Sequence, residues 1–234
     1  MDRLMAEQLG RQSLWLRDSW LWLLREKVVH GKGQIALEVG CGAGHVMDII
    51  GELANVRGVD NDPDMVSICL AKGLDVRLAD AGKLPFEDCS FDIVYCSFLL
   101  LWLEEPAKAL VEMARVSRKW VICLAEPDYG GRLDYPPELE GLGNAMVGDL
   151  LARGADPFVG RKLRALFAEA GMDAEIGIHQ GVWPSEKLRA EAEGELAWAA
   201  EGERNALKEI LNAALDRGEA FQFNPVFYAI ARKG

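Results

Sequence analysis

The stretch ALEVGCGAGHVMDII, residues 36–50, contains an apolar run that breaks at three alternate glycines and then resumes. These glycines are Gly40, Gly42 and Gly44. A buried strand that leads through a glycine turn into a helix brings bare backbone N–H and C=O groups close to a ligand. The stretch therefore predicts a ligand-binding turn, and the spacing of its glycines bears on which ligand that is.

Short apolar runs alternate with helical patterns on the C-terminal side of this turn, which is typical of repeated βαβ units and a mainly parallel sheet. We expect strands at 35–39, 56–60, 75–80, 91–98, 120–127, 174–182 and 225–233. We expect helices at 44–53, 62–73, 104–119 and 161–172, and a long charged helical pattern at 185–217. The pattern predicts an α/β fold.

The first 30 residues read as one amphipathic helix with three tryptophans, Trp15, Trp20 and Trp22. So many large apolar side chains predict that the helix packs on the body of the protein. Two roles stay open for residues 1–30, a cap on one edge of the core and a lid over a cleft.

Two stretches interrupt the alternation of strands and helices. Residues 128–160 are rich in glycine, proline and acidic residues and read as a loop with one helix, and residues 185–218 form the second stretch. In an open α/β sheet, such insertions near strand ends often build a substrate pocket. We expect a single domain, 1–234, with a ligand-binding core at 35–127.

Composition excludes several classes of protein. The formal net charge of −11 argues against a nucleic-acid partner, because such affinity rests largely on lysine and arginine. The five cysteines show no C-x-x-C spacing, which indicates reduced thiols and no metal site. The N-terminus lacks the features of a signal peptide and charges interrupt every would-be membrane span there, so we expect a cytoplasmic protein without a membrane span.

The spacing of the glycines excludes two nucleotide-binding motifs. The dinucleotide fingerprint G-x-G-x-x-G needs its third glycine at position 45, where this chain has His45. The triphosphate-binding pattern G-x-x-x-x-G-K-[ST] does not occur in the sequence. A dehydrogenase therefore remains only a distant alternative.

The heptad EVGCGAG, residues 38–44, resembles motif I of the class I S-adenosylmethionine-dependent methyltransferases, acidic-x-G-x-G-x-G, at every position. VRGVDNDPDMV (56–66) is similar to the second strand of that family, and LADAGKLPFEDCSFDIV (78–94) to its next segment. The resemblance extends over approximately residues 35–125, and more weakly over 160–172. It implies a Rossmann-like, doubly wound, seven-stranded, mainly parallel sheet.

The resemblance also implies S-adenosyl-L-methionine as cofactor and S-adenosyl-L-homocysteine as its product. In the family, the residue matching Asp60 accepts hydrogen bonds from both ribose hydroxyls, which suits the two oxygens of a carboxylate. Asp80 would meet the adenine amino group beside the backbone of Ala81. The candidate cofactor-binding residues are Glu38, Gly40, Gly42, Gly44, Asp60, Asn61, Asp80, Ala81 and Cys96.

Two of these candidates have more than one interpretation. Glu38 is either a buried structural carboxylate or the residue that orients the methionine moiety, and both readings stay open. Cys96 matches a family position that acts through its main-chain carbonyl, so we expect its sulfur to pack in the core.

The chain departs from the family pattern at two places. Many relatives carry a histidine at the end of the fourth strand, whereas residues 97–102 read SFLLLW, which removes the obvious general base. The usual PGG turn before the fifth strand is replaced by SRKW at 117–120, so that corner must be built differently.

Asp128 and Tyr129 are the candidate catalytic residues. They follow the fifth strand at its C-terminal end, where ligands bind in this architecture. We expect structural positions for His45 and His179 and an exposed position for His30.

The function that the resemblance implies is methyl transfer from S-adenosylmethionine to a small-molecule acceptor, in the small soluble branch that methylates metabolites, natural products or quinone-like precursors. A protein or tRNA substrate is one alternative, and a non-catalytic cofactor-binding module is another. The sequence leaves open a monomer or a homodimer.

Overall fold

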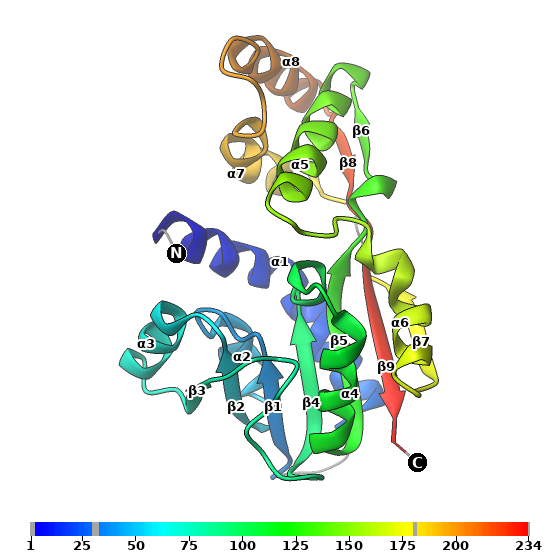
Figure 1. Cartoon of the computed structure of the whole chain (residues 1–234). Coiled ribbons are helices and arrows are strands. Elements are labelled where there is room, and N and C mark those ends of the chain that lie inside the picture. Colours follow the sequence, from blue (N-terminus) through cyan, green and yellow to red (C-terminus); the bar gives the residue numbers. More distant parts are fainter. Residues whose placement is uncertain (1–2, 30–32, 180–181, 234) are drawn as a thin grey trace.

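The computed structural model describes residues 3–29, 33–179 and 182–233, and the chain forms a large sheet flanked by helices (Figure 1). His30 lies outside the described residues. The sheet strands are β1 (Ile35–Val39), β2 (Asn55–Asp60), β3 (Val76–Leu78), β4 (Phe91–Ser97), β5 (Ser117–Pro127), β7 (Ala174–Ile178) and β9 (Val226–Arg232). Their order is β3-β2-β1-β4-β5-β9-β7, and only β9 runs antiparallel to its neighbours. The described residues thus confirm the expected α/β fold with a seven-stranded, mainly parallel sheet.

Helices cover both faces of this sheet, which explains why its central strands are almost continuously apolar. They are α1 (Arg3–Lys27), α2 (His45–Ile50), α3 (Pro63–Ala71), α4 (Pro106–Val116) and α6 (Leu163–Glu169). On one face, buried side chains of α4 such as Leu110 pack on β4 and β5, and α6, with the buried Phe167, lies against β7 and β9. On the other face, α1 and α2 pack on the same strands.

Helix α1 serves as more than a cap on an edge. In its C-terminal half, Trp20 and Leu24 are almost fully buried against the sheet. At the middle of the helix, the ring of Trp15 lies 4.6 Å from that of Trp183, centroid to centroid. The helix therefore joins the sheet to the elements that lie beyond its strand ends. Neither α1 nor any other described helix has the length and hydrophobicity needed to cross a membrane.

The two insertions fold against each other beyond the C-terminal ends of β4 and β5 (Figure 1). They contain β6 (Leu133–Tyr135), α5 (Glu140–Ala152), α7 (Ser185–Leu196) and α8 (Arg204–Arg217), and the strand β8 (Phe221–Phe223) that follows the second insertion joins them. We call this group of elements the accessory layer. Strands β6 and β8 pair as an antiparallel ribbon that is separate from the large sheet.

The structure departs from the sequence-based expectation in this layer and at one corner. The helical pattern at 185–217 is two helices, and Arg204 closes the break by donating to Leu196 O, Ala197 O and Ala199 O. The short strands β6 and β8 were not expected. At the SRKW corner β5 begins at Ser117, directly after α4, so no separate turn is needed.

Candidate functional site

The predicted cofactor residues come together at one edge of the sheet. Gly40 follows β1, Asp60 is the last residue of β2, Asp80 follows β3 closely, and Cys96 lies next to the end of β4. These four strands are adjacent and parallel, so their C-terminal ends meet at the same edge. In doubly wound folds this is the edge where ligands bind.

The glycine turn has a backbone conformation that only glycine adopts without strain. Gly40, Gly42 and Gly44 have φ angles of 73°, 50° and 80°. The turn is tied to β2, because the N–H groups of Gly40 and Cys41 both donate to Val59 O, at 2.8 and 3.0 Å. A fixed loop with three glycines thus separates β1 from α2.

The carboxylate of Asp60 lies against this turn. Its Oδ2 accepts a hydrogen bond from Gly42 N at 2.7 Å, and its Oδ1 accepts one from Asp62 N at 2.9 Å. Each carboxylate oxygen can accept two hydrogen bonds, so both can still accept a hydroxyl proton. This fits the ribose diol of S-adenosylmethionine.

Asp80, Ala81 and Asn61 lie on the neighbouring loops. Asp80 and Asn61 are exposed and Ala81 is half-buried. Asp80 Oδ1 accepts a hydrogen bond from Gly82 N at 2.6 Å, which holds the carboxylate within its own turn. Asp80 and Asn61 are therefore open to solvent at the C-terminal edge of the sheet.

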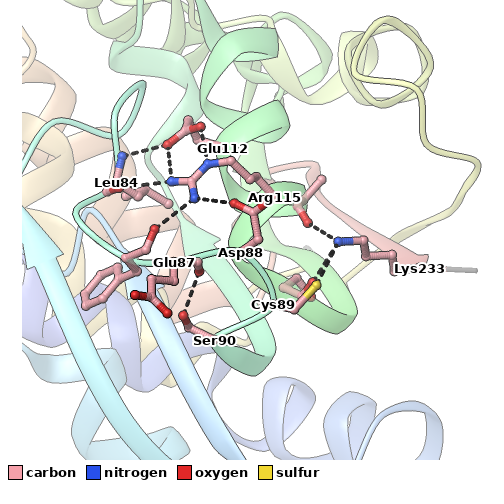
Figure 2. Close-up of polar contacts among 11 residues, drawn as sticks. Leu84, Glu87, Asp88, Cys89, Ser90, Glu112, Arg115 and Lys233 are labelled. Atoms are coloured by element: carbon pink, nitrogen blue, oxygen red, sulfur yellow. Dashed lines mark hydrogen bonds and ion pairs between the residues drawn. The ribbon is translucent and has the colours of Figure 1, made fainter.

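The segment between Asp80 and β4 is held by one arginine of α4 (Figure 2). Arg115 donates to Leu84 O and Phe86 O, at 3.0 and 2.8 Å, and pairs with Glu112 and Asp88. The L-P-F-x-D pattern, residues 84–88, thus serves to fix this loop. The family resemblance includes this pattern, but only the structure shows that Arg115 binds its residues.

Glu38 is a buried carboxyl group in β1, next to Tyr95 of β4. Tyr95 Oη donates to Glu38 Oε2 at 3.2 Å. Burial raises the pKa of Glu38 well above its ordinary value. The hydrogen bond shows a structural role, and a contact with the methionine moiety remains a prediction.

Cys96 is fully buried, and its sulfur lies in the core. The ligand atoms of Cys96, Cys123 and Glu126 lie within 4.8 Å of one another, in an arrangement that could be read as a metal site. Glu126 already accepts three backbone N–H bonds, and burial raises the pKa of the Cys123 thiol. The three hydrogen bonds to Glu126 favour a structural role for its carboxyl group over metal ligation.

Glu126, at the end of β5, organises the turn after β4. Its carboxyl oxygens accept hydrogen bonds from the N–H groups of Leu99, Leu100 and Leu101, at 2.8, 2.7 and 3.3 Å. The side chain of Leu99 in turn packs on Gly40, where an added Cβ would lie only 2.6 Å from Leu99 Cδ1. Glu126 therefore shapes the glycine turn indirectly, a role that sequence reasoning missed.

Asp128 has a structural partner. Arg161 Nε and Nη2 donate to its two carboxylate oxygens at 2.6 and 2.7 Å. Tyr129 packs beside the core, and burial raises the pKa of its phenol. The catalytic roles predicted for Asp128 and Tyr129 stay predictions, and the bidentate ion pair speaks against Asp128 as a free base.

His179 is buried between α1 and the sheet. Its Nε2 donates to Leu124 O and its Nδ1 accepts from Ser19 Oγ, both at 2.7 Å, in the tautomer that serves both partners. It lies in a structural position, as the sequence predicts.

The fold is that of a doubly wound α/β protein in which ligands bind at the C-terminal ends of the strands. Comparison with known proteins identifies the family. Residues 37–124 match the family described as "Methyltransferase domain". The chain is 32% identical over 166 residues to the demethylmenaquinone methyltransferase of Bacillus licheniformis, which covers 60% of this chain and 71% of that protein. The chain belongs to the class I S-adenosylmethionine-dependent methyltransferases.

Two further similarities agree with this. The phosphatidylethanolamine N-methyltransferase of Cereibacter sphaeroides is 35% identical over 99 residues, and the match covers 39% of this chain and 49% of the relative. The chain thus spans about half the length of that relative. A solved structure of an S-adenosylmethionine-dependent methyltransferase from Aquifex aeolicus superimposes with a TM-score of 0.59 at 18% identity, covering 99% and 98% of the two chains, which shows a shared fold.

Proposed function

We propose that this protein transfers a methyl group from S-adenosylmethionine to a small-molecule acceptor. The single observation that carries the proposal is the placement of the Asp60 carboxylate against the glycine turn, 2.7 Å from Gly42 N. When bound, S-adenosylmethionine supplies a methyl group that is activated by the positive charge of its sulfonium.

The residues of this chain would bind and orient the donor. Asp60 would accept the ribose hydroxyls, Asp80 and the backbone of Ala81 would hold the adenine, and the turn of Gly40, Gly42 and Gly44 would admit the rest of the molecule. Asn61 lies beside Asp60 and would border the same nucleoside. Positioning is the main task, because a sulfonium needs little further activation.

The acceptor would bind between the donor and the accessory layer. In this proposal α1 and the insertions at 128–160 and 185–218 roof the site and exclude water. Phosphatidylethanolamine and demethylmenaquinone, for which the two relatives are named, are small organic molecules, which supports an acceptor of that class.

The acceptor atom is proposed to need no protein base. Besides Asp60 and Asp80, which are assigned to the donor, three described carboxyl groups lie near the strand ends. Each is engaged, Glu38 by Tyr95, Glu126 by backbone N–H groups and Asp128 by Arg161. A thiolate, a carboxylate or a free amine can attack the methyl group without losing a proton first.

Isothermal titration with S-adenosylmethionine tests the donor site. Asp60→Ala and the isosteric Asp60→Asn remove the negative charge and at least one acceptor, so the affinity should fall at least about tenfold. Asp75→Ala is the matched control, because Asp75 forms only an exposed ion pair with Arg57 and should leave affinity unchanged. Equal binding by wild type and both Asp60 variants, with folding confirmed by circular dichroism, would overturn the proposal.

A further inference from the structure

The accessory layer encloses a cavity of its own, away from the strand ends of the large sheet. It is lined by β6, α5, α7, α8 and β8, which Figure 1 shows together beyond the sheet. Most of its wall is apolar, and the apolar lining residues include Leu142, Leu188, Leu211 and Phe221. One corner is polar and contains an arginine.

This polar corner is a buried network around Arg132, whose side chain is 4% exposed. Its Nε and Nη2 donate to the two oxygens of Asp134 at 2.8 and 2.9 Å. Nη2 also donates to Glu195 Oε2 at 2.6 Å, and Gln222 Nε2 donates to that same oxygen at 3.0 Å. Arg132 and Gln222 therefore meet at one carboxylate oxygen.

Two atoms of this network are buried without a hydrogen-bond partner among the described residues. They are Arg132 Nη1, which can only donate, and Gln222 Oε1, which can only accept. Leaving such buried groups unpaired destabilises the folded state, because they lose their hydrogen bonds to water. A well-packed interior would not retain both without a reason.

The two atoms define the chemistry of a matching ligand. A hydroxyl group can accept a hydrogen bond from Arg132 Nη1 and donate one to Gln222 Oε1. An ammonium group can only donate, so it could pair with Gln222 Oε1 but not with Arg132 Nη1. A carboxylate would be repelled by the neighbouring carboxylates of Asp134 and Glu195. The interior of the cavity has a volume of about 20 Å³ for a water-sized group, which is room for one hydroxyl. The volume including the open mouth is about 310 Å³.

We propose that this cavity is a binding site for the hydroxyl group of a small, otherwise apolar molecule. The hydroxyl pairs with Arg132 Nη1 and Gln222 Oε1, and the apolar part of the ligand lies against the leucines of α5, α7 and α8. The site is distinct from the proposed donor site and does not rest on methyl transfer.

Phenol and toluene are matched probes, because a hydroxyl and a methyl group differ little in size. Isothermal titration without S-adenosylmethionine should show phenol binding at least about fivefold more tightly than toluene, the equivalent of one satisfied buried group. Anisole, which accepts but cannot donate, should bind less tightly than phenol.

Gln222→Met removes the amide at similar length and should abolish the preference for phenol. Gln34→Met is the matched control, since Gln34 Oε1 is also buried and has no hydrogen-bond partner in the described part of the chain, but lies outside this cavity. If Gln222→Met does not fold, NMR titration of the wild-type protein with phenol tests the proposal instead. Phenol should then shift the signals of the Gln222 side-chain amide and of the Leu188 and Leu211 methyl groups. Equal binding of the three probes, or no shift at these groups, would show that the cavity holds ordered water only and would overturn the proposal.

Discussion

Glu126 combines full burial with three hydrogen bonds from backbone N–H groups. Burial penalises the charged carboxylate and raises its pKa to about 8, although the N–H groups oppose this shift. Glu126 holds the turn at residues 99–101, and Leu99 of that turn packs on Gly40. The protonation state of Glu126 therefore affects both the stability of the fold and the turn that borders the candidate site.

The raised pKa of Glu126 predicts a loss of stability as pH rises. Between about pH 4.5 and 8 the native state keeps a proton that the unfolded state has released, so the free energy of unfolding falls with pH. One proton contributes at most about 1.4 kcal/mol per pH unit. Glu126→Gln should remove this component, as measured by urea unfolding at several pH values. Glu87→Gln, at an exposed glutamate, should keep the wild-type slope, and an unchanged slope in Glu126→Gln would contradict the prediction.

At the scale of elements, the loop between Asp80 and β4 depends on α4. Arg115 spans the two by contacting two carbonyl groups and two carboxylates (Figure 2). Arginine suits this position because its fixed fork of donors serves several acceptors at once. Apart from a single β-bridge between Asp80 and Lys83 the described loop has no regular structure, so these contacts contribute strongly to its shape.

Arg115→Met should lower the free energy of unfolding by about 2 kcal/mol, because it leaves the partly buried carbonyls of Leu84 and Phe86 without their donor. Hydrogen exchange should quicken selectively at residues 80–90. Arg57→Met, which removes an exposed ion pair, should cost no more than about 1 kcal/mol. Slow exchange retained at 80–90 in Arg115→Met would show that the loop is held by other contacts.

At the scale of the whole molecule, α1 binds parts of the chain that are distant in sequence. Ser19 bonds His179 beyond β7, Arg17 pairs with Glu52 after α2, and Trp15 lies on Trp183 of the accessory layer. These contacts join the N-terminal helix, the sheet and the accessory layer, so a change at one of them should affect global stability.

His179 makes this assembly sensitive to acid. Burial lowers its pKa below 6.5, so on acidification the unfolded state binds a proton before the native state does. The free energy of unfolding should therefore fall as pH drops from 6.5 toward the lowered pKa, and change little from this group above 6.5. Thermal unfolding of His179→Gln should show a smaller loss between pH 6.5 and 5 than the wild type. An identical acid dependence would exclude His179 as the cause.

Much of the candidate site follows from local sequence patterns. The glycine turn was recognisable because its glycines follow a strand end at alternate positions. Asp60 was recognisable because it is a carboxylate at the end of the next strand. Glu126 and Arg115 were not, since their partners lie about 26 and 30 residues away and no spacing rule connects them. The ribbon of β6 and β8 was missed because its inward residues, Asp134 and Gln222, are polar, which reverses the usual alternation.

The sequence by itself determined the α/β class, the order of the main strands and helices along the chain, and the position of the candidate donor site, because apolar periodicity and glycine geometry act over a few residues. Only the tertiary structure decided that α1 joins the sheet to the accessory layer, that Arg161 forms an ion pair with Asp128, and that Arg132 and Gln222 line one cavity. These features depend on side chains from distant segments meeting in three dimensions, and burial then makes each pairing energetically decisive.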